Sequence, residues 1–167
     1  YPINILDRVA GPVLHPVFSK YQDDRGMIFT YYLSILKIIF LLTIPFSAYM
    51  YCFSQEIILV LYGEKWIGTV SIFQLISLLI WVRITIASTT PIYQATGNTK
   101  KLFYSNLSSN IIIIGLICIG VYNQNIRLLC LLILIGYYIS IMIHYFMLIS
   151  KIFQESYMKL MSILKTP

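Results

Sequence analysis

Residues 67–90 read IGTVSIFQLISLLIWVRITIASTT, and this apolar stretch decides the fold. Its single charged side chain is Arg83. An α-helix rises about 1.5 Å per residue, so roughly 20 mostly apolar residues are enough to cross a bilayer. Three further stretches of this kind lie at residues 31–54, 104–122 and 128–150. Together, these four stretches predict an all-α fold, a polytopic transmembrane helix bundle.

The composition supports this fold class. Hydrophobic residues make up 59% of the chain and charged residues 11%, whereas soluble proteins contain about 25% charged residues. The net charge is +6, but the cations lie at the ends of apolar runs, where they would meet phospholipid head groups. We therefore expect membrane lipids, and no nucleic acid, as partners. The three cysteines have no metal-ligand spacing, so no metal site is predicted.

Polar bends and prolines divide the chain into one partial helix, four spanning helices and a tail. A short interfacial helix or turn is expected at residues 55–63. Because the chain begins with Tyr1 rather than Met, we interpret it as the C-terminal fragment of a longer membrane protein. The predicted elements are a partial helix at 1–19, spans at 27–54, 66–90, 104–122 and 127–150, and a cytoplasmic amphipathic tail at 151–167.

The distribution of cations predicts the orientation. Cytoplasmic loops of membrane proteins carry an excess of Lys and Arg. If the spans alternate in direction, Lys65 and Arg127 lie on one side and seven cations lie on the other. The second side is therefore predicted to be cytoplasmic, with the C-terminus on it. The seven cations are Lys20, Arg25, Lys100, Lys101, Lys151, Lys159 and Lys165.

Three cations inside the predicted helices are the candidate substrate and cavity residues: Arg8, Lys37 and Arg83. A charge at the bilayer centre costs about 2.5–3.5 kcal/mol on insertion scales. We interpret these residues as lining a water-filled cavity that opens to the cytoplasm and attracts an anionic cargo. In the alternatives, Lys37 extends its ammonium to the interface, and Arg83 donates to carbonyls freed near Pro91 or Pro45. Pro45 is also the hinge candidate.

No enzyme signature occurs in the sequence. It contains no nucleophile elbow, no HExxH and no glycine-rich phosphate loop. We therefore predict that the protein is not an enzyme, with no catalytic residues and no cofactor. His144 is interpreted as an interhelical hydrogen bonder, with a proton relay as the alternative. The polar residues 105–110 either line a cavity mouth or pack helix against helix.

Three motif blocks follow one another along the chain. They are Asn4, Arg8-Val9, Pro12-Val13, Pro16–Lys20 and Gln22–Asp24; then Tyr62–Trp66 with Gln74-Leu75; then Tyr93–Lys100. In order and spacing the blocks resemble those of bacterial polysaccharide flippases, the exporters of lipopolysaccharide O-antigen and exopolysaccharide. These proteins belong to the multidrug/oligosaccharidyl-lipid/polysaccharide exporter superfamily. The resemblance covers about residues 1–150.

The resemblance implies a two-lobe exporter of the bacterial inner membrane, with this chain as part of the second lobe. Such proteins move undecaprenyl-pyrophosphate-linked oligosaccharide from the inner to the outer leaflet by alternating access, and a coupling cation is plausible. The implied partner is therefore an anionic lipid-linked oligosaccharide. Arg8 matches the arginine of the first block, and Arg83 lies where similar proteins often carry a basic residue. Lys37 has no counterpart in the blocks.

Three other functions remain open from the sequence. An integral-membrane polymerase or acyltransferase of the same pathway would need a catalytic loop outside the lipid, and the outward loops here are short. A drug/cation antiporter of the same superfamily would use carboxylates within the membrane, and Asp7 is the single candidate. A membrane scaffold without a cargo would need neither feature.

Overall fold

The computed structural model describes residues 25–149, and this part of the chain is built from helices without a strand. The prediction of an all-α fold is confirmed. Arg8 and the elements predicted at 1–19 and 151–167 lie outside the described residues. The helices are α2 Arg25–Cys52, α3 Ser54–Tyr62, η1 Glu64–Thr69, α4 Val70–Ser77, α5 Leu79–Ala87, α6 Thr90–Ala95, α7 Thr99–Tyr122 and α8 Ile126–Leu148.

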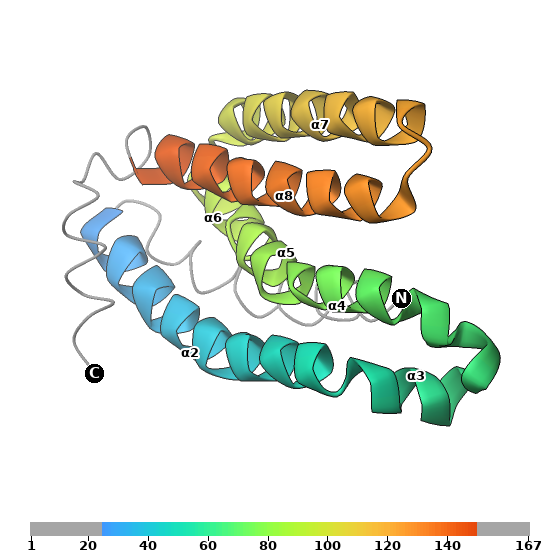
Figure 1. The fold of residues 1–167 in the computed structure, drawn as a ribbon. Coiled ribbons are helices and arrows are strands. Elements are labelled where there is room, and N and C mark those ends of the chain that lie inside the picture. Colours follow the sequence, from blue (N-terminus) through green and yellow to red (C-terminus); the bar gives the residue numbers. More distant parts are fainter. Residues whose placement is uncertain (1–24, 150–167) are drawn as a thin grey trace.

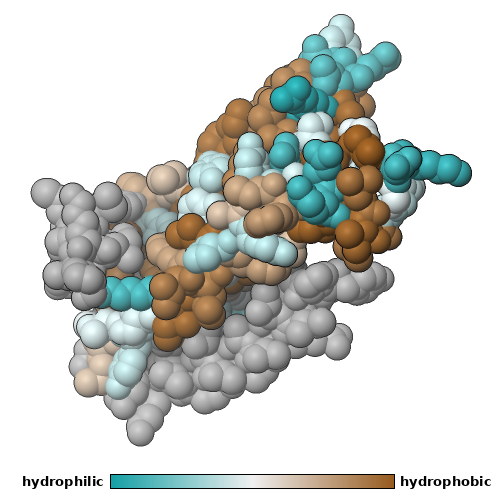
Figure 2. All heavy atoms as spheres, turned by 60° about the horizontal axis from the view of Figure 1, so that its bottom comes forward, coloured by the Kyte–Doolittle hydropathy of each residue, from teal (hydrophilic) through white to brown (hydrophobic). Residues whose placement is uncertain are grey.

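Four helical segments are long and apolar enough to cross a membrane: Gly26–Cys52, Glu64–Ala95, Thr99–Tyr122 and Ile126–Leu148. Many of their large apolar side chains face outward, as expected for helices in contact with lipid. On the face drawn in Figure 2, hydrophobic side chains cover much of the coloured surface, and most of the strongly hydrophilic side chains project at the upper right. The described chain is therefore a polytopic helix bundle.

The crossings pack side by side in a row (Figure 1). α2 packs against α4 and α5, these two pack against α8, and α8 packs against α7. The turn before α7 lies at the end where α2 begins, and α3 lies with the α7–α8 turn at the other end (Figure 1). Successive crossings therefore alternate in direction, and short turns are sufficient to connect them.

Close approach of α7 and α8 depends on two glycines. A Cβ at Gly120 would lie 2.8 Å from the Leu129 Cα, and a Cβ at Gly136 would lie 3.2 Å from the Ile113 side chain. Small residues at a helix interface let two backbones approach and gain van der Waals contact, which is a main source of helix association in lipid. The hairpin is thus held together by backbone proximity as well as by side chains.

The second crossing, in chain order, is divided into three α-helical pieces. α4 ends at Ser77, α5 covers Leu79–Ala87 and α6 begins at Thr90, with interruptions of one and two residues. The path of the chain changes direction between α4 and α6 (Figure 1). Pro91 lies in the first turn of α6, where its missing N–H is tolerated. α2, in contrast, continues through Pro45 to Cys52.

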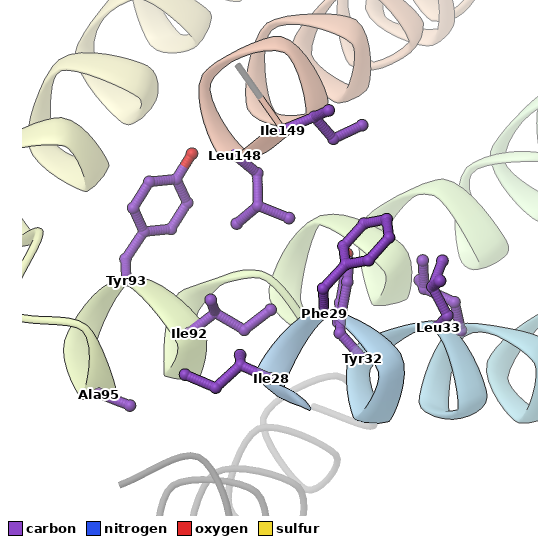
Figure 3. Close-up of a cluster of buried hydrophobic side chains, with 10 residues drawn as sticks. Ile28, Phe29, Tyr32, Leu33, Ile92, Tyr93, Ala95, Leu148 and Ile149 are labelled. Carbon is purple, nitrogen blue, oxygen red and sulfur yellow. The ribbon is translucent and has the colours of Figure 1, made fainter. Parts of the chain in front are cut away.

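The buried apolar core lies at the end of the bundle where α2 begins and α8 ends. Ile28, Tyr32 and Leu36 of α2 are fully buried there with Ile92 and Tyr93 of α6. Leu148 and Ile149 cover them from the end of α8 (Figure 3). This cluster ties three crossings together and fixes the level at which they meet.

Some helix ends differ from the sequence-based expectation. α7 begins at Thr99, so Lys100 and Lys101 belong to its first turn, although the apolar run begins at residue 104. This difference arises because hydropathy marks where lipid begins, while backbone hydrogen bonding of a helix can continue beyond the apolar residues. The short helix or turn expected at 55–63, in contrast, is present as the helix α3.

Candidate functional site

A chain of aromatic rings links α2, α5 and α8. The Trp81 ring lies 6.1 Å from Phe40 and 5.7 Å from Tyr138, centroid to centroid, and both pairs meet edge to face. Such pairs are favourable because the positive edge of one ring meets the negative face of the other. The three rings therefore set the depth and rotation at which these helices contact one another.

Arg83 lies on α5, two residues beyond Trp81, and is exposed. Its guanidinium carbon lies over the ring of Tyr137 on α8, 5.4 Å from the ring centroid. A cation over an aromatic face is attracted by the ring quadrupole. Within residues 25–149, Arg83 has neither a salt bridge nor a hydrogen bond, so its donors are not used by the described part of the chain.

Lys37 lies at nearly the same depth as Arg83. It is eleven residues beyond Gly26 in α2, and Arg83 is twelve residues before Ala95, at the same end of the bundle. At about 1.5 Å per residue, both lie roughly 17 Å inside the helical segment. Lys37 is exposed and is three residues from Phe40. Lys37 and Arg83 are therefore at similar distances along their helices from this end of the bundle, and whether Lys37 lines a cavity or extends to the interface stays a prediction.

Hydroxyl groups surround the interruptions that flank α5. Ser47 on α2 donates to the Ser77 carbonyl at 2.6 Å, where α4 ends. At the other interruption, Ser88 donates to the Thr85 carbonyl and Thr89 to the Ile86 carbonyl, each at 2.7 Å. Buried carbonyls at a helix interruption need partners because lipid offers none. These bonds allow α5 to be a separate piece of helix within the crossing.

The site is thus a cation on a short helical piece between two interruptions. Interrupted helices form the substrate sites of many secondary transporters, because they place polar groups near the midplane. Sequence reasoning singled out Arg83, but it did not find Tyr137 or the interruptions. The signal for the interruptions was Ser77, Ser88 and Thr89, whose hydroxyls donate to nearby backbone carbonyls.

Within residues 25–149, no hydrogen bond, ion pair or ring contact joins Arg83 to Lys37 or Pro45, and Arg8 lies outside this part of the chain. Pro45 is exposed on α2, and its role as a hinge remains a prediction. Among residues 25–149, no group of three His, Cys, Asp or Glu side chains could hold a metal ion. An apolar pocket of about 360 Å³ opens between α3, η1 and α4, lined in part by Tyr62, Trp66 and Phe73. It belongs to the α3 end of the bundle.

Comparison with known families gives one match, which covers part of the chain. The sequence model of a family described as "Polysaccharide biosynthesis protein" matches residues 1–71. The matched part includes Arg8, Lys37 and Pro45, and Arg83 lies outside it. No curated protein and no solved structure matches the chain. The match and the four apolar helices support a membrane-embedded protein of polysaccharide biosynthesis.

Proposed function

We propose that the chain is part of the second lobe of a flippase that translocates undecaprenyl-pyrophosphate-linked oligosaccharide for lipopolysaccharide or exopolysaccharide synthesis. The family match over residues 1–71 supports the pathway, and the helix bundle supports a protein that acts within the membrane. The observation that carries the transport step is Arg83, an exposed arginine well inside a crossing without a described counter-charge.

An arginine in this setting suits a diphosphate. Its planar guanidinium presents several N–H donors in a fixed fork that matches phosphate oxygens. Contact with the Tyr137 ring holds the guanidinium at one place while its in-plane donors stay available. In a medium of low dielectric constant, an anion close to Arg83 offsets the free energy needed to keep the charge there.

The charges of the described residues favour an anionic cargo over a cationic one. The two acidic residues in this part of the chain, Glu56 and Glu64, lie in α3 and η1, far along the chain from α5. A cation or drug antiporter would need a carboxylate near the midplane. Lys37, at a depth similar to that of Arg83, adds a second positive charge to this level of the bundle.

In the proposed cycle, the diphosphate of the lipid-linked sugar enters from the cytoplasmic leaflet and is held by Arg83. The bundle then changes shape and opens to the opposite side. The interruptions on either side of α5, and the proline in α2, are places where the regular hydrogen bonding of these helices is already altered, so we propose that they bend there. Arg8 belongs to the same hypothesis as a further phosphate ligand.

The test replaces Arg83 in the full-length protein, in cells that depend on it for surface polysaccharide. We expect R83A to lower surface polysaccharide at least about tenfold, because loss of a charge-assisted hydrogen bond costs roughly 1.5–3 kcal/mol. R83K should retain part of the activity, because it keeps the charge without the fork. R127A is the matched control, since Arg127 is an exposed arginine at the end of a crossing.

Two further measurements exclude other causes of a loss of surface polysaccharide. Membrane abundance of each variant must equal that of the unmodified protein, so that lost export is not lost protein. Lipid-linked oligosaccharide should accumulate in the inner leaflet of R83A cells, whereas a defective polymerase would leave it in the outer leaflet. Unchanged surface polysaccharide in R83A would remove Arg83 from the site.

A further inference from the structure

A row of buried polar residues lies where α7 faces α8, at the end of the hairpin far from its turn. Ser105 and Ser109 are 0% and 4% exposed, and Ser140 and His144 are each 2% exposed. Among the described helices, α7 packs on α8 and α6. These side chains are therefore enclosed by α6, α7 and α8, and we refer to the four residues as the polar seam.

The helix register places the members of the seam opposite one another. Gly136 of α8 lies against Ile113 of α7. Moving away from the α7–α8 loop by one turn of each helix brings Ser140 level with Ser109. A second turn of each helix brings His144 level with Ser105. α6 closes the seam, because the Tyr93 hydroxyl donates to the His144 carbonyl at 3.3 Å.

Most polar atoms of the seam have no partner within the described chain. Neither Ser105 Oγ, Ser109 Oγ nor His144 Nδ1 has a hydrogen-bond partner among residues 25–149, although all three atoms are buried. Ser140 differs, because its hydroxyl donates to the Gly136 carbonyl at 2.8 Å. Three unpartnered polar atoms on facing helices are energetically unfavourable in lipid, where no bulk solvent can satisfy them.

We propose that the polar seam is a binding site for ordered water. A hydroxyl can donate and accept, and a neutral imidazole nitrogen does one or the other, so these atoms are complementary to a molecule that does both. Buried waters typically make about three hydrogen bonds to polar groups that lack other partners. A cation is a poorer ligand, since the acidic residues of the described chain, Glu56 and Glu64, are in α3 and η1.

The seam gives the hairpin two kinds of contact. Near its turn, α7 and α8 are joined by direct backbone proximity at Gly120, and at the other end they are joined through water. Water-mediated hydrogen bonds are nearly as favourable in enthalpy as direct ones. This proposal does not depend on the flippase function, because it concerns how α6, α7 and α8 are held together.

Substitution of serine by alanine distinguishes a seam that holds water from a dry seam, because the thermal midpoint of unfolding should fall in the first case and stay the same or rise in the second. If water bridges the hydroxyls, S105A and S109A remove a hydrogen bond and lower the thermal midpoint of the full chain by about 2–4 °C. If the hydroxyls are dry, alanine removes an unfavourable buried group, and the midpoint stays the same or rises. The control S34A should lie close to the unmodified protein, since Ser34 is exposed on α2, lies outside the seam and bonds within its own helix.

A second measurement decides the matter if a variant fails to fold. Magnetisation transfer from water to the imidazole of His144 can be recorded by NMR on the unmodified full chain, labelled at histidine and placed in lipid nanodiscs. His15, the other histidine, is assigned with the variant H15Q. We expect direct transfer from a bound water to the His144 ring. Absence of transfer, or a midpoint that does not fall in S105A and S109A, would overturn the proposal.

Discussion

At the scale of single residues, Arg83 and Lys37 have different chemistry at nearly the same depth. Arg83 lies over the Tyr137 ring, and its guanidinium is planar, delocalised and weakly hydrated. Lysine carries a compact, strongly hydrated ammonium on a flexible stem and shifts position more easily. The ring of Tyr137 is therefore the described feature that holds the guanidinium of Arg83.

This contact predicts a measurable coupling between positions 83 and 137. In a double-mutant cycle of R83Q and Y137L, the two substitutions should be non-additive by about 0.5–2 kcal/mol, because either one removes the same cation–π contact. Thermal or denaturant unfolding in detergent provides the free energies. The variant Y137F keeps an aromatic ring and should keep most of the stability.

The neighbouring Tyr138 provides the control for this cycle. Its ring packs on Trp81, so R83Q and Y138L should be additive within about 0.5 kcal/mol. Additivity of R83Q with Y137L would mean that the ring does not hold the guanidinium, and the position of Arg83 would then need another explanation.

At the scale of elements, the interrupted crossing and the α7–α8 hairpin show two ways to build helices for lipid. In α4–α6, side-chain hydroxyls satisfy carbonyls where the regular helix stops. In the hairpin, both helices are continuous, and glycine brings their backbones together. The first arrangement permits bending, while the second holds two crossings as a unit.

Two glycines of α7 test the second arrangement. G120A should destabilise the protein by about 1–3 kcal/mol, because the new Cβ would lie 2.8 Å from the Leu129 backbone and force the helices apart. G115A is the matched control, because nothing lies within 4 Å of a Cβ at that position. It should be neutral or stabilise by up to about 1 kcal/mol through helix propensity. Equal effects of the two substitutions in an unfolding measurement would contradict the hairpin register.

The sequence predicted the crossings well for a physical reason. A span needs a fixed length of apolar residues, and residues 128–150 meet that requirement without any charge. Hydropathy could not predict the interruption at Leu78, because a helix that is interrupted for one residue keeps the same apolar side chains. The same limit applies to Tyr137, which is one of 14 tyrosines and is distinguished only by lying opposite Arg83.

At the scale of the whole molecule, the described chain is a row of crossings joined alternately at its two ends. Thr99 begins α7 at the end that contains the buried cluster, and Ile126 begins α8 at the end that contains α3 (Figure 1). The count of cations predicts that the end with Lys100 and Lys101 faces the cytoplasm. Thr99 and Ile126 are both exposed, so each can report the side on which its end lies.

Single cysteines at these two positions test the alternation and the orientation separately. In a background in which Cys52, Cys118 and Cys130 are replaced, T99C should react with a membrane-impermeant maleimide in inside-out vesicles, and I126C in right-side-out vesicles. Labelling of both from one side would contradict the alternating crossings. The reversed labelling pattern would agree with the alternating crossings but would mean that the orientation of the protein in the membrane is the opposite of the predicted one. Arg83 would then face the outer half of the membrane, and entry of the cargo from the cytoplasmic leaflet would no longer be consistent with its position.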